Sequence, residues 1–438
     1  MGYVPSSDAE KLDMLRTVGL NSPDGLFSDI PESVRLRREL RLPAGKSEFE
    51  VFGEIKSIAA KNRVFNTILR GAGAYRHYIP SVVDHLSSRE EFVTAYTPYQ
   101  PEISQGILQC IFEYQTMIAR LTGLDVSNAS VYDGATAEAE AIVMCVEKNR
   151  RNAVVSATVK PQNLEVIRTY CKGQNIGVRV APEKDGATDT DALHGLIDGG
   201  TACVLAEQPN YYGILEDMES VGNAAKQAGA KFIMGCNPIS TAILKTPGEC
   251  GADIAAGEGQ PLGIPLSFGG PYLGFITARK ELTRRLPGRI VGQTADRQGR
   301  RGFVLTLQAR EQHIRREKAS SSICSNEALC AVRAAVYMSV MGPDGLRGVA
   351  VQSAAHAHYL AERLGPLGFT LVYDKPFFNE FLTESPADPE LIMEILEDRG
   401  ILGGLPLGDK ILWCATEMNR REELDRVIGI LSEAKERA

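Results

Sequence analysis

A glycine-rich stretch from residue 251 to residue 275 has the composition of a turn that borders a functional site. The flanking apolar residues predict a short strand that ends at Ile254 and a return to extended chain from Tyr272 to Thr277. Because ligands of open α/β sheets bind beyond the carboxyl ends of the strands, we expect chemistry beside this turn. Glycine permits φ values and close backbone approaches that a side chain would forbid, and the turn contains Gly257, Gly259, Gly263, Gly269 and Gly270.

The two ends of this stretch, Gly251-Ala-Asp-Ile and Phe268-Gly-Gly-Pro, resemble the cofactor-lysine segment of fold-type I pyridoxal-phosphate enzymes. In that family a lysine just past the strand holds the cofactor as a Schiff base, which requires a nucleophilic primary amine. Here Gln260 and Pro261 occupy that position, and no lysine lies between Lys245 and Lys280. The resemblance therefore implies the fold of a cofactor enzyme without a catalytic lysine or a covalently bound cofactor of its own.

Two further positions depart from the catalytic members of that family. Asp133 opens the loop between a strand-like segment at 129–132 and a helix expected to run to about Glu147. In the catalytic members this helix N-terminus binds the cofactor phosphate, whereas a carboxylate would repel a phosphate or cap the same amides. Asn237 falls where those members place an aspartate against the pyridine nitrogen, and a neutral amide cannot stabilise a pyridinium by charge. We therefore expect no cofactor-binding residues in this chain.

The segment from Phe92 to Gly106 presents polar side chains from a backbone that two prolines hold extended. Functional loops are usually displayed on rigid scaffolds, so we interpret the segment as an active-site wall or an interface. The alternative is that its tyrosines anchor the core with satisfied hydroxyls. Two of its residues stand where the next helix begins and are expected to cap it. The candidates are Tyr96, Thr97, Tyr99, Gln100, Glu102 and Ser104, of which Glu102 and Ser104 are the expected caps.

His77 is a further candidate, because it follows a glycine-rich loop that begins at Gly71. A histidine there could assist chemistry or bind an anion, since its charge changes near physiological pH. The alternative is a hydrogen-bonded surface group. The residues alone leave both interpretations open.

Four motifs together resemble the P-protein of the glycine cleavage system, glycine dehydrogenase (decarboxylating). They are the segment from Phe92 to Gly106 and those at 128–137, 300–313 and 376–381, and the likeness covers nearly the whole chain. P-proteins occur either as one long chain with two homologous halves or as two separate subunits. The length of 438 residues and the missing lysine match the first half, the alpha subunit.

The resemblance implies a role as one subunit of glycine dehydrogenase (aminomethyl-transferring). A lysine-bearing beta subunit (subunit 2) would hold the pyridoxal phosphate, glycine would be decarboxylated, and the aminomethyl group would pass to the lipoyl arm of the H-protein. A heterotetramer is expected, with this chain inactive alone. Two alternatives stay open: an autonomous enzyme that uses a remote lysine such as Lys245, or a purely structural pseudoenzyme subunit.

The bulk composition is that of an ordinary globular protein, with 44% apolar and 24% charged residues. A formal charge of −7 argues against a nucleic-acid partner. The nine cysteines form no C-x-x-C pair and no metal-like spacing, which indicates buried thiols in a reducing cytoplasm and no metal site. No apolar run approaches the ~20 residues of a membrane span.

Hydrophobic periodicity predicts an α/β fold with a large, doubly wound, mainly parallel sheet, because short apolar runs alternate with helical patterns between about residues 152 and 277. We expect an N-terminal arm over 1–46, a large domain over 47–318 and a small α+β domain over 319–438. The arginine-rich segment 284–316 is either a solvated face or a subunit contact.

Overall fold

The computed structural model describes residues 5–94, 97–319, 321–323 and 325–437. The chain divides between Arg63 and Val64 into two units, which are described separately. Tyr96 lies outside the described residues.

The first unit contains two short helices whose starts follow from local sequence. Helix α1 (Asp8–Thr17) begins with a capping box in which Ser7 and Glu10 exchange hydrogen bonds, and α2 (Glu48–Ala59) begins with the same motif made by Ser47 and Glu50. The expected boundary at residue 46 assigned the second helix to the large domain, whereas α2 lies in the first unit. Its apolar side chains are exposed, with Phe49 at 86%.

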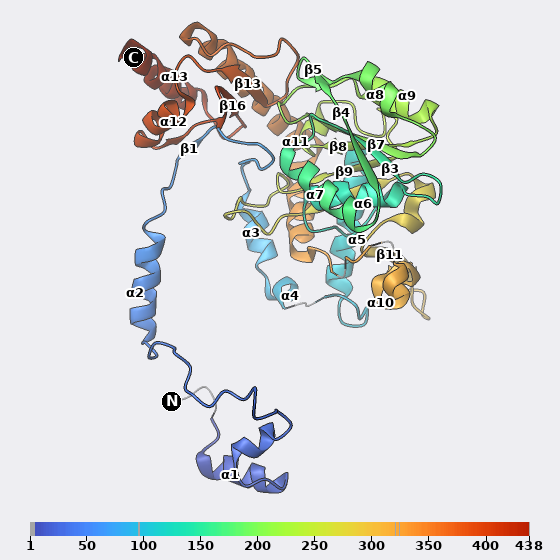
Figure 1. Ribbon diagram of the computed structural model, residues 1–438, viewed down its shortest axis with the longest axis vertical. Helices are drawn as coiled ribbons and strands as arrows, with labels where there is room; N and C mark the ends of the chain where they lie inside the picture. Colours follow the sequence, from blue (N-terminus) through green and yellow to red (C-terminus); the bar gives the residue numbers. More distant parts are fainter. Residues whose placement is uncertain (1–4, 95–96, 320, 324, 438) are drawn as a thin grey trace. The chain divides into compact units, whose positions relative to one another are not determined.

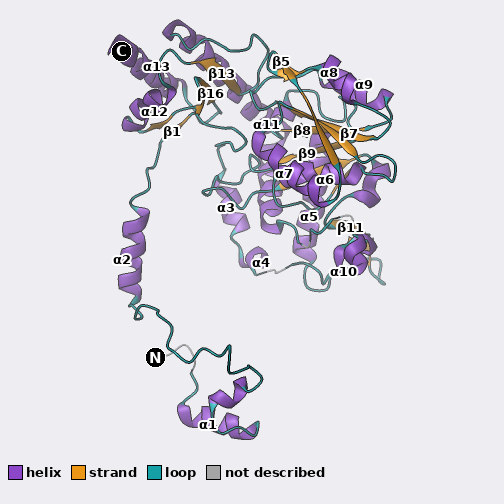
Figure 2. Ribbon diagram, in the orientation of Figure 1, coloured by secondary structure: helices purple, strands orange, loops and turns teal. Residues whose placement is uncertain are grey.

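The second unit is built around a seven-stranded sheet. Its central strands lie among helices in Figures 1 and 2. Five neighbouring strands run parallel, and the strand next to them is antiparallel. The predicted alternation of strands and helices is thereby confirmed, because parallel neighbours require helical crossovers. In sheet order the strands are β2 (Val126–Ser127), β10 (Gly274–Ala278), β9 (Ile254–Glu258), β8 (Lys231–Cys236), β7 (Thr201–Gln208), β3 (Asn152–Ser156) and β4 (Gly177–Ala181).

Helices cover both faces of this sheet. Along β9, Ile254 and Ala256 belong to one apolar cluster while Ala255 belongs to another, as the two-residue period of a strand requires. Both clusters are buried, so the sheet is doubly wound as predicted. The principal helices are α5 (Gln105–Thr122), α6 (Gly134–Cys145), α7 (Pro161–Gly173), α9 (Met218–Gln227) and α11 (Ala328–Leu364), which is broken by non-helical backbone at Gly342.

The predicted strand ending at Ile254 is wrong in its position, since β9 begins at Ile254 and continues to Glu258. Ala255, Ala256 and Gly257 have low strand propensity, but β10 pairs with all three and β8 pairs with Ala255 and Ala256 from the other side. Pairing on both edges overrides local preference. The turn that follows is therefore shorter than expected, and Glu258 stands at the carboxyl end of a strand.

Other sequence predictions fail where pairing is local or brief. The segment 129–132 is not a named strand; β2 lies before it, and Val131 makes only an isolated bridge to Gly274. Leu371 likewise makes only an isolated bridge, to Thr383. Short apolar runs cannot be distinguished from packed loops by periodicity.

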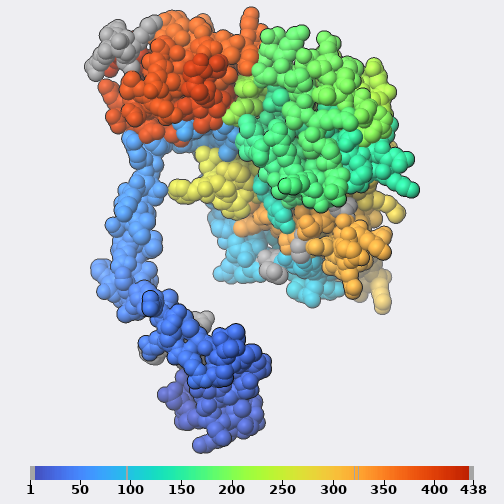
Figure 3. Space-filling model, viewed as in Figure 1, coloured from blue at the N-terminus to red at the C-terminus, as the bar shows by residue number. Residues whose placement is uncertain are grey.

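The C-terminal elements pack around the buried Trp413, whose indole donates a 3.0 Å hydrogen bond to the hydroxyl of Thr383. The orange-to-red residues form a body beside the green residues in Figure 3. This agrees with the expected small α+β region. Its elements are β13 (Glu380–Glu384), α12 (Pro389–Asp398), β14 (Ile401–Leu402), β15 (Leu405–Leu407), β16 (Lys410–Cys414) and α13 (Arg421–Arg437), with β1 (Thr67–Ile68) paired to β14.

The remaining elements are short. They are α3 (Ser81–Ser87), α4 (Glu90–Val93), α8 (Thr190–Leu196), α10 (Gln312–Arg315), β5 (Glu183–Lys184), β6 (Ala187–Thr188), β11 (Ile290–Ala295) and β12 (Arg301–Thr306). Among the described residues, no helix is both long and apolar enough to cross a bilayer, and no His, Cys, Asp and Glu cluster is arranged to hold a metal ion.

Candidate functional site

A pocket of about 400 Å³ lies where the fold predicts a site, beyond the carboxyl ends of the central strands. Its walls are the loop Gly71–Tyr75, the start of α6, the start of α7 and the turn after β9. Gly71 is required in this loop, since an added Cβ would lie 2.4 Å from a carboxylate oxygen of Glu380. The predicted turn therefore does border a pocket.

Carboxylates occupy the first N–H groups of α6. Asp133 accepts a 2.7 Å hydrogen bond from the amide of Thr136, as the capping alternative for this residue required. Glu258, at the end of β9, accepts a 2.9 Å bond from the amide of Gly134. Helix and strand approach closely here: a Cβ added at Gly134 would lie 2.8 Å from that of Glu258.

Glu258 is held by three backbone donors in all. Besides Gly134, the amides of Gln260 and Leu273 donate to its other oxygen at 2.8 and 2.9 Å. Burial raises the pKa of the Glu258 carboxyl to about 7, although these three hydrogen bonds favour its charged form. The sequence analysis missed this residue, because the predicted strand stopped before it.

Gln260, at the position of the missing lysine, is 2% exposed and forms a structural contact. Its amide oxygen accepts from the backbone N–H of Tyr75 at 2.9 Å, and its amide nitrogen donates to the carbonyls of Tyr75 and Ile264 at 2.9 and 2.8 Å. The side chain thus ties the loop Gly71–Tyr75 to the turn after β9.

Lys160 is the lysine that the structure places in the pocket wall. Its ammonium lies 2.6 Å from a carboxylate oxygen of Glu207, and Asn163 bridges Glu207 to Glu138 with bonds of 2.9 and 3.0 Å. Burial opposes the charge, but the two carboxylates raise the pKa of Lys160 above its usual value. A protonated, paired ammonium is not a nucleophile. No motif marked this residue in the sequence.

The other candidate lysine, Lys245, does not reach the pocket. Its side chain is 66% exposed and pairs with Glu219 on the surface. Asn237 does line the pocket, but its side-chain oxygen accepts a 2.9 Å bond from the amide of Ile239. The alternative of a remote lysine that swings in is therefore not favoured. The pocket residues do not fit a phosphate-bearing cofactor held by a lysine of this chain.

A second site is formed by the segment that contains the tyrosine motif. Thr97, Tyr99, Gln100 and Ser104 line one cavity of about 450 Å³. Glu102 is not among the described lining residues, and it is exposed. Neither expected cap is confirmed as one: Ser104 is the N-cap residue of α5, but its side chain makes no capping bond.

Instead, Gln105 fixes the start of α5, a role that the sequence analysis missed. Its side-chain nitrogen donates to the carbonyls of Pro101 and Phe303 at 2.6 and 2.9 Å. Its side-chain oxygen accepts from the amide of Phe303 at 2.8 Å. The helix start and β12 are therefore joined through one side chain.

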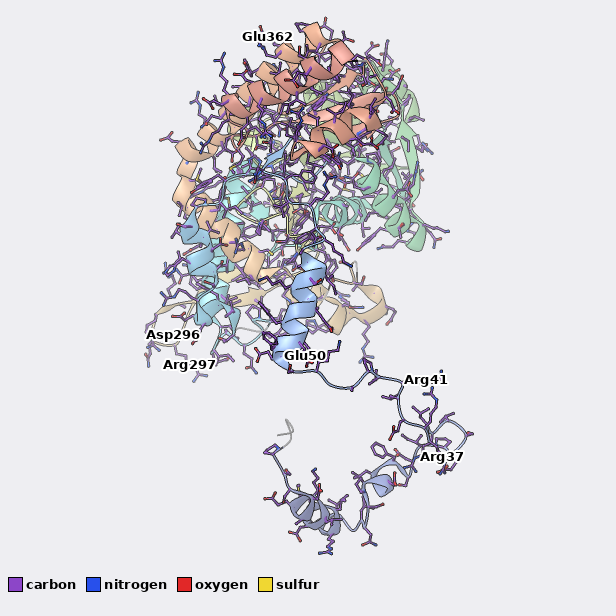
Figure 4. The ribbon with its side chains drawn as sticks, turned by 90° about the vertical axis from the view of Figure 1, so that its left-hand side faces the viewer. Arg37, Arg41, Glu50, Asp296, Arg297 and Glu362 are labelled. Atoms are coloured by element: carbon purple, nitrogen blue, oxygen red, sulfur yellow. The ribbon has the colours of Figure 1, made fainter. Side chains whose placement is uncertain are left out.

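The arginine-rich segment meets the tyrosine motif at Tyr99. Arg289 is 2% exposed, lies 3.9 Å from the Tyr99 ring centroid and donates a 2.5 Å hydrogen bond to its hydroxyl. Tyr99 also lines a cavity of about 670 Å³ with Glu311 and His313. At the tip of the β11–β12 hairpin, by contrast, Asp296 and Arg297 point outward (Figure 4), so only part of the segment is a solvated face.

His77 is buried, with 7% exposure, so the alternative of a surface histidine is wrong. Its Nδ1 lies 2.7 Å from a carboxylate oxygen of Glu417, which also accepts bonds from the amide of Tyr78 and the hydroxyl of Ser353. Although burial alone would raise it, the contact with His77 holds the pKa of Glu417 below its usual value. The pair joins the loop to the C-terminal region.

Comparisons with known proteins agree with this architecture. A family model, the glycine cleavage system P-protein, matches residues 1–431. A protein of Moorella thermoacetica named "Probable glycine dehydrogenase (decarboxylating) subunit 1" is 50% identical, over 98% of this chain and 99% of its own. A crystal structure of the inhibitor-bound glycine decarboxylase (P-protein) of the glycine cleavage system superposes with a TM-score of 0.93 at 42% identity, covering 99% of this chain and 100% of that chain.

More distant structures support the fold alone. Glutamate decarboxylase of Lactobacillus brevis has a TM-score of 0.69 at 14% identity and covers 93% of this chain and 97% of its own. The fold is thus that of fold-type I pyridoxal-phosphate enzymes, as the resemblance implied. With a family match over almost its whole length and relatives that share half of its residues, the chain belongs to the glycine cleavage system P-protein family.

Proposed function

We propose that this chain is the alpha subunit of a two-subunit P-protein. With a lysine-bearing beta subunit it decarboxylates glycine and transfers the aminomethyl group to the lipoyl arm of the H-protein. Support comes from the relatives named as subunit 1, which match this chain from end to end. We place the cofactor in the beta subunit and the complex in the cytoplasm. When bound there, pyridoxal phosphate supplies the electron sink for decarboxylation.

One observation carries the proposal. The chain keeps the fold of a cofactor enzyme, but a glutamine with a structural role occupies the position of the cofactor-binding lysine. Gln260 is buried and makes three hydrogen bonds, so it does not leave room for a swinging lysine. A homologous partner that contributes the lysine resolves this mismatch.

In the complex, the role of this chain is to form a wall of the partner's site. One cavity is lined by polar side chains, those of Thr97, Tyr99, Gln100 and Ser104. Arg289 fixes Tyr99 by donating a hydrogen bond to its hydroxyl. A wall of this kind excludes water from a reactive carbanion-like centre and orients the substrate. His77, braced by Glu417, and the exposed Glu102 are further wall or interface candidates, as is Tyr96.

The first unit is the proposed contact with the beta subunit. Its apolar side chains are exposed over most of its length, including Phe49 at 86%, Val34 at 71%, Phe52 at 68% and Ile55 at 60%. Exposed apolar surface of this extent marks an interaction site. Permanent complexes commonly bury more than ~2,000 Å².

Co-expression tests the proposal. The chain is expressed alone and together with a lysine-bearing P-protein subunit from the same genome, and both samples are analysed by sedimentation and by glycine–CO2 exchange with lipoylated H-protein. We expect a stable hetero-oligomer that is active, and an inactive single chain. If the two chains do not associate at micromolar concentration, or if this chain alone decarboxylates glycine, the subunit assignment is wrong.

A further inference from the structure

We propose that Glu258 and Gln260 stand in for the anchoring groups of a cofactor, so that this chain's own side chains keep its cofactor-type pocket closed to phosphate-bearing ligands. The Glu258 carboxylate takes the place of an anion at the N-terminus of α6. The Gln260 amide takes the place of a covalent tether. The pocket of the chain by itself is closed in this way, whatever partner the chain has.

The anion position at α6 is filled by the covalently attached carboxyl group of Glu258. Three backbone N–H groups converge on the Glu258 carboxylate at 2.8–2.9 Å, and one of them is the first amide of α6. Such amides, aligned with the positive end of a helix, are the groups that bind phosphate in related folds. A phosphate monoester would have to displace Glu258 and would then face Asp133, which caps the same helix. Two carboxylates at the phosphate position repel it.

The tether position is closed in a different way. Gln260 pairs with both the N–H and the carbonyl of Tyr75 and so holds the loop Gly71–Tyr75 against the pocket. Glu380 reinforces this closure: one oxygen accepts from the amide of Ala72 at 2.6 Å, and the other from the Tyr75 hydroxyl at 2.5 Å. The loop is thereby fixed without a ligand. A lysine introduced at position 260 would offer no acceptor to the Tyr75 N–H and would still find the α6 amides occupied.

Lys160 does not substitute for the tether. Its ammonium is locked to Glu207 at 2.6 Å on the side of the pocket formed by α7. Because Glu138 and Glu207 are both adjacent, neutralising Lys160 would leave buried carboxylates uncompensated. Glu258 thus occupies the phosphate position and Gln260 the tether position. Lys160, which lines the pocket, is already paired with Glu207.

Chemical rescue tests the role of Glu258. In Glu258→Ala the three amides lose their acceptor, and formate can take the place of the missing carboxylate. We expect the melting temperature of this variant to rise by about 2 °C or more as formate replaces chloride at constant ionic strength. Wild type and Glu258→Gln, which keeps the volume filled, should not respond. Asp217→Ala is the matched control, since Asp217 caps α9 outside the pocket. A formate response no larger in Glu258→Ala than in these controls would overturn the proposal.

Adduct formation tests the two positions together. Gln260→Lys and the double variant Gln260→Lys with Glu258→Ala are incubated with pyridoxal phosphate, reduced with borohydride and mapped by mass spectrometry. We expect at least a several-fold higher yield of pyridoxyl adduct at position 260 in the double variant. Equal yields, or a stoichiometric adduct in Gln260→Lys alone, would refute closure by Glu258. If either variant does not melt cooperatively, the formate titration alone decides.

Discussion

Removal of the Tyr99 hydroxyl is the sharpest test of the proposed site wall. Tyr99 is 43% exposed, so its ring faces the cavities while its hydroxyl accepts the hydrogen bond from the buried Arg289. Tyr99→Phe keeps the ring that stacks on the guanidinium at 3.9 Å and removes the hydroxyl that accepts from Arg289. The change therefore separates the positioned hydroxyl from the packing around it.

The magnitude follows from the charge on the donor. A hydrogen bond to a charged group contributes about 1.5–3 kcal/mol, which corresponds to a loss of about 10- to 150-fold if the bond acts in the transition state. We expect glycine–CO2 exchange by the reconstituted complex to fall within this range. Complex yield should be unchanged, because the ring and the cation–π contact remain in place.

The assay compares wild type, Tyr99→Phe and Tyr132→Phe in complexes of equal yield with H-protein in excess. Tyr132 is a control of similar exposure, at 41%, and lines neither cavity around Tyr99. Its variant should exchange at the wild-type rate. Unchanged exchange in Tyr99→Phe would refute the wall hypothesis and return Tyr99 to a structural role with Arg289.

Three further outcomes are expected. Burial raises the pKa of Glu140, which is 2% exposed, from 4.5 to about 7, so its contribution to stability is full below pH 4.5 and lost as the pH rises through 7. In denaturant titrations, Glu140→Gln should reduce the change in the free energy of unfolding over this pH range by roughly 3 kcal/mol at most. An unchanged pH profile would contradict this. Phe49→Ser with Phe52→Ser should weaken association with the beta subunit at least ~10-fold in sedimentation without lowering the melting temperature, whereas a lowered melting temperature would place these residues in a core. The wild-type chain alone, reduced with borohydride after incubation with pyridoxal phosphate, should carry no stoichiometric adduct on Lys160 or any other lysine, and one mapped adduct would overturn the expectation.

Most of the large elements could be predicted because their signals are local. Alternating apolar runs and helical patterns identified β3, β4, β7 and β8 with the helices between them, since side-chain period reports which faces are buried. The starts of α1 and α2 are local features too, since each is a capping box made by residues three apart. These features depend on residues within a few positions of one another.

The missing anchor was also legible in the sequence, because a Schiff base requires one residue type at one position. The structural role of the residue at that position could not be predicted from the sequence. Gln260 meets Tyr75 across 185 residues, and Tyr99 meets Arg289 across 190. No local pattern records such contacts. From the sequence, Gln260 indicated only that the lysine is missing. Its hydrogen bonds to Tyr75 became visible only in the tertiary structure.

The sequence by itself determined the fold class, the family and the loss of the lysine, because periodicity, motif spacing and residue chemistry are properties of the chain. Tertiary structure alone decided that Ala255 and Ala256 lie in a strand, since pairing with β8 and β10 on both edges outweighs their low propensity. It also decided that His77 is buried against Glu417 rather than exposed. In both cases partners distant in sequence supply the free energy that local residues lack.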